Sequence, residues 1–165
     1  MRDRIVVLAL VVAAAVGVVA STPSSAAPSR EAQVRLAFRR LDRLVQAMQQ
    51  DSIAETYVED GEMRNDGRLV VRGRDSIRTF LAGFVGKVTV SHDRTTITRI
   101  MLRGDTAFVS GVFDQTATLL ADHRTVKARG GVEAVWVRRP EGWRIVSMGT
   151  RPLPGSGARR ASSAN

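Results

Sequence analysis

Four side chains in this 165-residue sequence have the chemistry for catalysis: His92, Tyr57, Asp60 and Glu133. His92 stands in the polar triplet Ser91-His92-Asp93, between stretches rich in valine and threonine. An imidazole changes charge close to neutral pH and could move a proton there. The alternative interpretation is a strand bulge with a partly exposed histidine.

Tyr57 and Asp60 stand at the predicted end of a short helix. Together, a phenol and a carboxylate could polarise a carbonyl group and remove a proton from the neighbouring carbon. The alternative is structural, with Tyr57 in the apolar core and Asp60 in the turn Asp60-Gly61.

Glu133 lies inside a predicted strand, as Asp114 does in the strand before it, and acids are unfavourable in strands. Because side chains alternate along a strand, Glu133 shares a face with Val135 and Val137. On a covered face it would be a buried general acid or base. On an open face, or after a register shift at Gly130-Gly131, it would pair with surface arginines.

The candidate ligand-binding residues are Asp114, Trp136 and Arg151. All but two of the 25 basic residues are arginine, so choosing Arg151 as the anion contact is nearly arbitrary. The only histidines, His92 and His123, do not form a pair with metal-ligand spacing. Phosphate-loop, nucleophile-elbow and dinucleotide fingerprints do not occur. We therefore predict no metal and no cofactor.

The formal charge of +9 raises the possibility of polyanion binding. The arginines are spread through every segment, however, and no block alternates them with exposed aromatic residues as a single-strand binder would. This pattern favours a solvated basic surface and no nucleic-acid partner.

Residues 1–26 have the order of a secretory signal peptide, with two early arginines, an uncharged apolar run and small residues before the predicted cleavage site. Cleavage predicts a secreted or periplasmic protein without stable membrane insertion. An uncleaved anchor is the alternative. Cysteine is absent, so no disulfide is expected. Residues 27–151 predict one domain, and residues 152–165 predict a disordered tail.

Three helices are expected in the first half of the domain. Apolar residues at three- and four-residue steps predict a helix over Arg30–Gln50, with Ser29 as its N-cap. Ser52-Ile53-Ala54-Glu55 matches a capping box and predicts a short helix that ends at Asp60-Gly61. Gly73-Arg74-Asp75-Ser76 opens the third helix, which is expected to end before Gly86.

Strands make up the rest of the domain. Asn65-Asp66-Gly67 predicts a small hairpin between Glu62–Arg64 and Leu69–Val71. Four long, bulged strands then form an antiparallel meander, and the hairpin around Pro140-Glu141-Gly142 would close one edge of the curved sheet. The predicted fold class is α+β. The long strands are predicted over Val88–Leu102, Thr106–Leu120, Thr125–Arg138 and Trp143–Thr150.

This order, together with four local strings, resembles the nuclear transport factor 2-like (cystatin-like) superfamily, and within it the SnoaL-like and ketosteroid-isomerase-like small domains. The strings are Tyr57 to Gly61, Val71 to Ile77, Gly104 to Ala107, and Val135 to Arg138 with Gly142 to Val146. The resemblance implies three helices packed in a strongly curved antiparallel sheet that forms a cone with an apolar cavity. It also implies that a histidine near position 92 faces the cavity, and that Tyr57 and Asp60 lie near its mouth.

Three functions follow as hypotheses, because this fold serves enzymes and binding modules alike. The first is an exported domain that binds a small, largely apolar molecule in its cone. The second is a cofactor-free isomerase, cyclase or dehydratase that uses the catalytic candidates named above. The third is an interaction module without catalysis, which forms a homodimer through the open sheet face.

Overall fold

A computed structural model describes residues 27–153. The predicted signal peptide at residues 1–26 lies outside the described residues, and so does the predicted tail from residue 154 onward. None of the helices between residues 27 and 153 is long and apolar enough to cross a membrane.

Helix α1 spans Arg30–Gln46, and Ser29 caps it as predicted, since the Ala32 amide donates to Ser29 Oγ at 3.2 Å. The helix ends four residues before the predicted Gln50. Met48 takes a positive φ of 49°, which a right-handed helix cannot include. The chain therefore turns there and starts a separate helix.

The predicted capping box at Ser52 is wrong. Helix α2 spans Gln50–Glu55, so Ser52 lies inside it, and no side chain caps its first residue. The helix also ends earlier than expected, and Tyr57 begins strand β1 (Tyr57–Asn65). Pairing with Ile145 in the last strand, which the local pattern does not encode, makes Tyr57 part of the sheet. Asp60-Gly61 is accordingly an irregularity within β1 rather than a helix stop.

The small hairpin is confirmed. Strand β2 (Arg68–Arg72) pairs antiparallel with β1, and Asp66 and Gly67 join them with φ angles of 48° and 74°. Both angles are positive, as the favoured two-residue hairpin turn requires. Helix α3 follows at Arg74–Ala82, and it ends at Gly83, ahead of the predicted Gly86.

Each of the four long strands begins and ends within one residue of its predicted bounds. They are β3 (Val88–Arg103), β4 (Thr106–Leu119), β5 (Thr125–Arg139) and β6 (Gly142–Arg151). Each pairs antiparallel with the next along the chain. Strand β3 carries two bulges, between Val90 and His92 and between Ile97 and Arg99, which confirms the expected irregularity.

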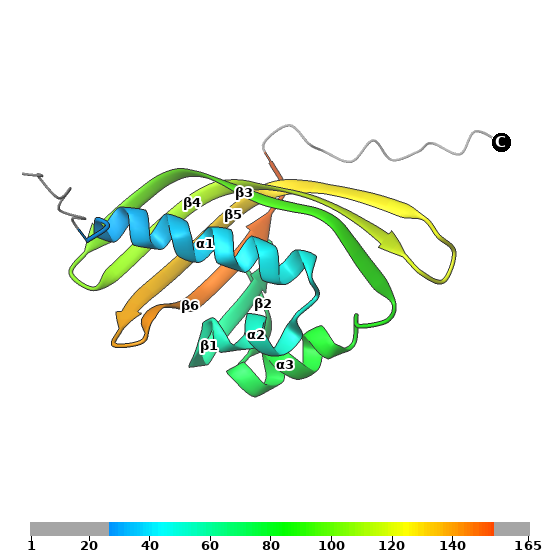
Figure 1. Ribbon diagram of the computed structural model, residues 1–165, viewed down its shortest axis with the longest axis horizontal. Coiled ribbons are helices and arrows are strands. Elements are labelled where there is room, and N and C mark those ends of the chain that lie inside the picture. The colour runs from blue at the N-terminus through cyan, green and yellow to red at the C-terminus, as the bar shows by residue number, and fades with distance from the viewer. Residues whose placement is uncertain (1–26, 154–165) are drawn as a thin grey trace, which may run out of the picture.

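The sheet is mixed, so the prediction of a wholly antiparallel sheet is wrong. Its strand order is β2-β1-β6-β5-β4-β3, and β1 runs parallel to β6. The β5–β6 hairpin is consequently central and does not close an edge, because the early hairpin β1–β2 joins the free side of β6. Figure 1 shows the open, curled sheet, with α1 lying across β3 to β6 and with α2 and α3 beside β1 and β2. This shape is consistent with a cone.

The core lies between α1 and the covered face of the sheet, which we call the inner face. Phe38 of α1 packs on Trp136 of β5, with ring centroids 4.9 Å apart. The neighbours of this pair in the buried cluster are Val34, Leu41, Ala107, Val109, Ala134, Trp143 and Ile145. Burial of these apolar groups holds α1 against the sheet.

Gly111 of β4 gives a test of the strand curvature. A Cβ atom at this position would lie 2.6 Å from the Thr96 carbonyl oxygen and 3.3 Å from Ile97 Cα, both backbone atoms beside the second bulge of β3. We expect Gly111→Ala to lower the free energy of unfolding by about 1–3 kcal/mol, since backbone cannot move aside as a side chain can. Urea denaturation measures this, with Ser110→Ala as the matched control, expected within about 0.5 kcal/mol of wild type. Equal stability of the two variants would contradict the close approach.

Candidate functional site

A pocket of about 420 Å³ lies on the inner face of the sheet, and we call it the inner pocket. This volume is in the lower part of the range of small-molecule sites. Most of its lining is apolar and comes from three helices, the turn between α1 and α2, and four strands: Leu41, Val45, Met48, Ile53, Met63, Leu81, Phe113, Ala128, Val132 and Met148. The polar lining residues are Asp42, Gln50, Tyr57, Asp93, Thr95, Gln115 and Thr150.

Asp93 reaches the inner pocket because of the first bulge in β3. Val90 pairs with Ala117 and His92 with Thr116, so Ser91 is an extra residue that shifts the alternation of side chains. Asp93 then points inward. Its Oδ1 accepts a hydrogen bond from Gln115 Nε2 at 2.9 Å, and its backbone carbonyl accepts one from Gln46 Nε2 at 2.7 Å.

Asp42 is the second carboxyl of the inner pocket, and it is only 8% exposed. It extends from α1, and its Oδ2 accepts a hydrogen bond from the Thr95 amide at 3.0 Å. Because β3 is an edge strand, that amide has no neighbouring strand to pair with. Asp42 therefore satisfies a backbone donor of β3 while its carboxyl stays in the interior.

Burial changes the proton affinity of both carboxyls. It raises the pKa of Asp93 to about 6, with a smaller upward effect from Asp42, while the Gln115 hydrogen bond and the charge of His92 act in the opposite direction. Burial also raises the pKa of Asp42, against the Thr95 hydrogen bond and the charges of Arg94 and Arg43. Asp93 consequently exchanges its proton close to neutral pH, as a general acid or base must.

Tyr57 lines the same pocket and is 1% exposed. Burial raises the pKa of its phenol far above the usual range, so the hydroxyl stays protonated. Its backbone carbonyl accepts two hydrogen bonds from Arg74, but within residues 27–153 the hydroxyl itself has no hydrogen-bond partner. A neutral donor of this kind can bind a carbonyl oxygen.

The structure places the other predicted catalytic residues away from the inner pocket. His92 is exposed and lines a hollow on the opposite, outer face of the sheet, together with Asp114. Asp60 is exposed on β1. The expectation that a histidine near position 92 faces the cavity is therefore wrong, because the bulge at Ser91 turns the His92 side chain outward. Asp60, expected near the mouth of the cavity, does not line the inner pocket.

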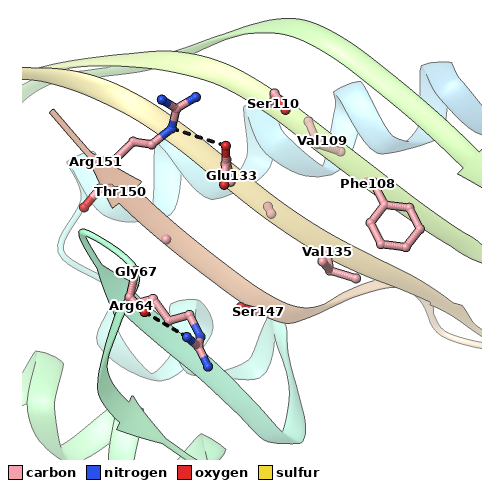
Figure 2. A pocket seen from close by; sticks show the side chains of 12 residues that line it. Arg64, Gly67, Phe108, Val109, Ser110, Glu133, Val135, Ser147, Thr150 and Arg151 are labelled. Carbon is pink, nitrogen blue, oxygen red and sulfur yellow. Dashed lines mark hydrogen bonds and ion pairs between the residues drawn. The ribbon is translucent and has the colours of Figure 1, made fainter. Parts of the chain in front are cut away.

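Glu133 does share its face with Val135, but that face is the outer one. Its neighbours Val132, Ala134 and Trp136 point inward and are buried. The Glu133 side chain is 62% exposed and pairs with Arg151, with Nε 3.2 Å from Oε1, as Figure 2 shows. Of the predicted ligand-binding residues, Trp136 is a core residue, and Asp114 and Arg151 lie outside. None of the three lines the inner pocket.

Two residues that sequence reasoning missed, Asp42 and Asp93, supply the carboxyls of the inner pocket. Asp42 follows Phe38 by four residues and precedes Val45 by three, so it interrupts the apolar stripe of α1. That interruption was a usable signal. Asp93 belongs to the triplet already singled out at His92, but its direction depends on where the bulge falls.

A metal site has no support in the part of the chain that is described. Across residues 27–153, no three His, Asp or Glu side chains gather closely enough to hold an ion. The inner pocket offers two carboxyls, a phenol and amide groups, which are suited to proton transfer and hydrogen bonding.

Comparison with known proteins identifies the family. Residues 28–149 match the SnoaL-like domain. The chain belongs to this family. The resemblance inferred from the sequence is thereby confirmed. No curated protein matches the chain.

Solved structures of low sequence identity share the fold. A ketosteroid isomerase-like protein from Erwinia carotovora atroseptica is 18% identical, with a TM-score of 0.64 over 74% of this chain and 95% of that one. A nuclear transport factor 2-like protein with a cystatin-like fold from Novosphingobium aromaticivorans is 20% identical, with a TM-score of 0.58 over 82% and 90%. A Mycobacterium tuberculosis protein of unknown function is 20% identical, with a TM-score of 0.63 over 72% and 69%. At these identities the likeness shows the fold alone.

The raised pKa of Asp93 predicts a specific pH dependence of stability. Between the ordinary value of 3.8 and about 6, the folded protein binds a proton that the unfolded chain releases. The resulting stabilisation is present at about pH 4 and below, and it is lost as the pH rises through about 6. Asp93→Asn cannot titrate, so its stability relative to wild type should increase over this interval. Urea denaturation at a series of pH values measures the difference, and parallel profiles for the two proteins would contradict it.

Proposed function

We propose that this SnoaL-like domain, exported by the signal peptide predicted at residues 1–26, binds a small, largely apolar molecule in the inner pocket and transfers a proton on it. The observation that carries the proposal is the placing of a carboxyl with a pKa of about 6 in an apolar pocket that also holds a neutral, unpartnered phenol. Apolar lining with a few polar groups is typical of small-molecule sites.

Asp93 and Tyr57 would divide the work. The Asp93 carboxylate takes a proton from the carbon next to a ligand carbonyl, and the Tyr57 hydroxyl donates a hydrogen bond to the oxygen on which negative charge develops. Return of the proton to another carbon gives an isomer. This step consumes no other reactant, and it belongs to the isomerase, cyclase and dehydratase class of chemistry. Asp42 supports it by adding to the raised pKa of Asp93 and by fixing the neighbouring Thr95 amide of β3.

Exchange of α-protons tests the proposal. A panel of cyclic ketones and hydroxy ketones is incubated with the protein in deuterated buffer, and deuterium incorporation is followed by NMR. We expect catalysed exchange with at least one member, lowered about 100-fold or more by Asp93→Asn because the proton acceptor is lost. Tyr57→Phe should slow exchange while keeping the ligand bound.

Two outer-face variants are the matched controls for the exchange assay. His92→Ala and Glu133→Gln should keep the wild-type rate, since neither side chain lines the inner pocket. Full activity in Asp93→Asn, or loss of activity in both outer-face variants, would overturn the assignment of Asp93.

A homodimeric interaction module is the second candidate, and the outer face of the sheet favours it. A hollow of about 320 Å³ lies there, drawn in Figure 2, and its lining includes Phe108, which is 37% exposed, and Val135 beside it in the register. An exposed aromatic next to such a hollow is a frequent feature of protein interfaces.

Light scattering after size exclusion tests this second candidate. We expect a dimer that Phe108→Arg converts to a monomer, because an added charge would be buried at the interface. Phe84→Arg is the matched control, since Phe84 is similarly exposed but lies after α3 and does not line this hollow. A wild-type monomer at high micromolar concentration would remove this candidate.

A further inference from the structure

The charge inside the inner pocket is opposite to that of the protein. The chain carries a formal charge of +9, almost all of it from arginine. Yet Asp42 and Asp93 line the inner pocket, and no lysine, arginine or histidine among residues 27–153 does so. The site therefore presents acidic groups to whatever enters it, within a basic protein.

The two carboxyls lie at the same end of the inner pocket, where α1 meets β3. Asp42 binds the amide of Thr95, two residues beyond Asp93 along β3. Gln46, one turn further along α1, binds the carbonyl of Asp93 itself. These two contacts hold one short stretch of α1 against one short stretch of β3, and the charge of Asp42 acts on Asp93.

Hydrogen-bonding capacity remains free on the pocket side. Asp93 Oδ1 accepts from Gln115, while within the described chain Oδ2 accepts no hydrogen bond. Tyr57 lines the same pocket, and its hydroxyl has no hydrogen-bond partner within residues 27–153. Neither atom is fully enclosed, because Trp136 Nε1 is the one fully buried side-chain polar atom without a partner among residues 27–153. Both therefore remain available to hydrogen-bond a group that enters the pocket.

The cations nearest the carboxyls are outside the inner pocket. Arg35, Arg39 and Arg94 line a surface groove between α1 and β3, which Asp42 borders from its other side, and His92 lines the hollow on the outer face. Arg43 follows Asp42 on α1, and together with Arg94 and His92 it lowers the pKa values of the pair only from a distance. No ion pair within 4.0 Å joins Asp42 or Asp93 to a basic residue of the part described. The carboxyls thus lack a cation on the side that a ligand would occupy.

We propose that the inner pocket selects an apolar molecule that carries a protonated amine, with the ammonium group donating to Asp93 Oδ2 beside Asp42. This inference rests on the proposed function, because it names the substrate class of the same pocket. A single ammonium allows two neighbouring carboxyls to ionise together. With an amine bound, Asp93 holds the charge and Asp42 is the carboxyl that can accept a proton, whereas Asp93 accepts it from the uncharged ketones of the exchange assay. An anionic ligand would meet two carboxylates and be rejected.

A matched series of rigid probes tests the charge preference: adamantylamine, adamantanol and adamantane carboxylate. They share one apolar body and differ in the charge of one substituent. By isothermal titration calorimetry at about pH 7.5, we expect the amine to bind about tenfold or more tightly than the alcohol, and the carboxylate more weakly than the alcohol. A hydrogen bond to a charged partner is sufficient for a difference of this size.

Variants and pH separate Asp93 from its surroundings. Asp93→Asn should lose the preference for the amine while it binds the alcohol as wild type does. At about pH 5 the preference should also fall in the wild type, because Asp93 is then protonated. His92→Ala should keep this pH dependence, which excludes His92 as its cause. If Asp93→Asn fails to fold, the wild-type and His92→Ala titrations still decide the question.

The outcomes distinguish this inference from the function on which it rests. Alcohol binding equal to or tighter than amine binding would overturn the amine preference and leave ligand binding in the inner pocket intact. A preference that persists in Asp93→Asn would overturn the role of Asp93 in it. Binding of none of the three probes would overturn the inference, whereas the proposed proton transfer is judged separately by the ketone exchange assay.

Discussion

The contact between α1 and the exposed edge of β3 is the interaction on which the inner pocket depends. An edge strand presents backbone amides and carbonyls that have no neighbouring strand, and these groups are costly to bury without partners. Asp42 and Gln46 supply those partners for Thr95 and Asp93. The two side chains fix α1 along β3, and the helix then covers the inner face. The same solution brings a carboxylate into the interior, where its desolvation raises its own pKa and contributes to that of Asp93.

Irregular strand geometry determines which groups face the inner pocket. The extra residue Ser91 turns Asp93 inward and His92 outward, although both belong to one polar triplet. At the second bulge, Thr96 and Ile97 approach β4 so closely that Gly111 is the residue that fits opposite them. Bulges increase local twist and bend a sheet. The bulges of β3 therefore contribute to the curvature around the inner pocket, and the first of them also turns the Asp93 carboxyl into it.

The distribution of charge separates the outside of the molecule from its interior. Arginines on the surface pair with carboxylates, as Arg78 does with Asp51, Glu55 and Asp75, and exposed pairs of this kind contribute little to stability. The inner pocket contains the reverse arrangement, with acids that lack basic partners. Net charge therefore describes the solvent-facing surface, while recognition inside the pocket depends on a few groups of the opposite sign.

The local features of this protein follow from residues that are close together in the chain. Helix and strand periodicity, the Ser29 cap and the Asp66-Gly67 turn are of this kind, and the structure confirmed them. The family likeness also rests on local strings, and the family comparison confirmed it. The remaining features depend on contacts between distant parts of the chain. Pairing with β6 placed Tyr57 in a strand, and it made the sheet mixed. Alternation along a strand predicts which side chains share a face, but only packing decides which face is covered. Helix α1 covers the face of Trp136, so Glu133 lies on the open one. The position of a bulge depends on the partner strand, so only the folded chain could select Asp93 over His92.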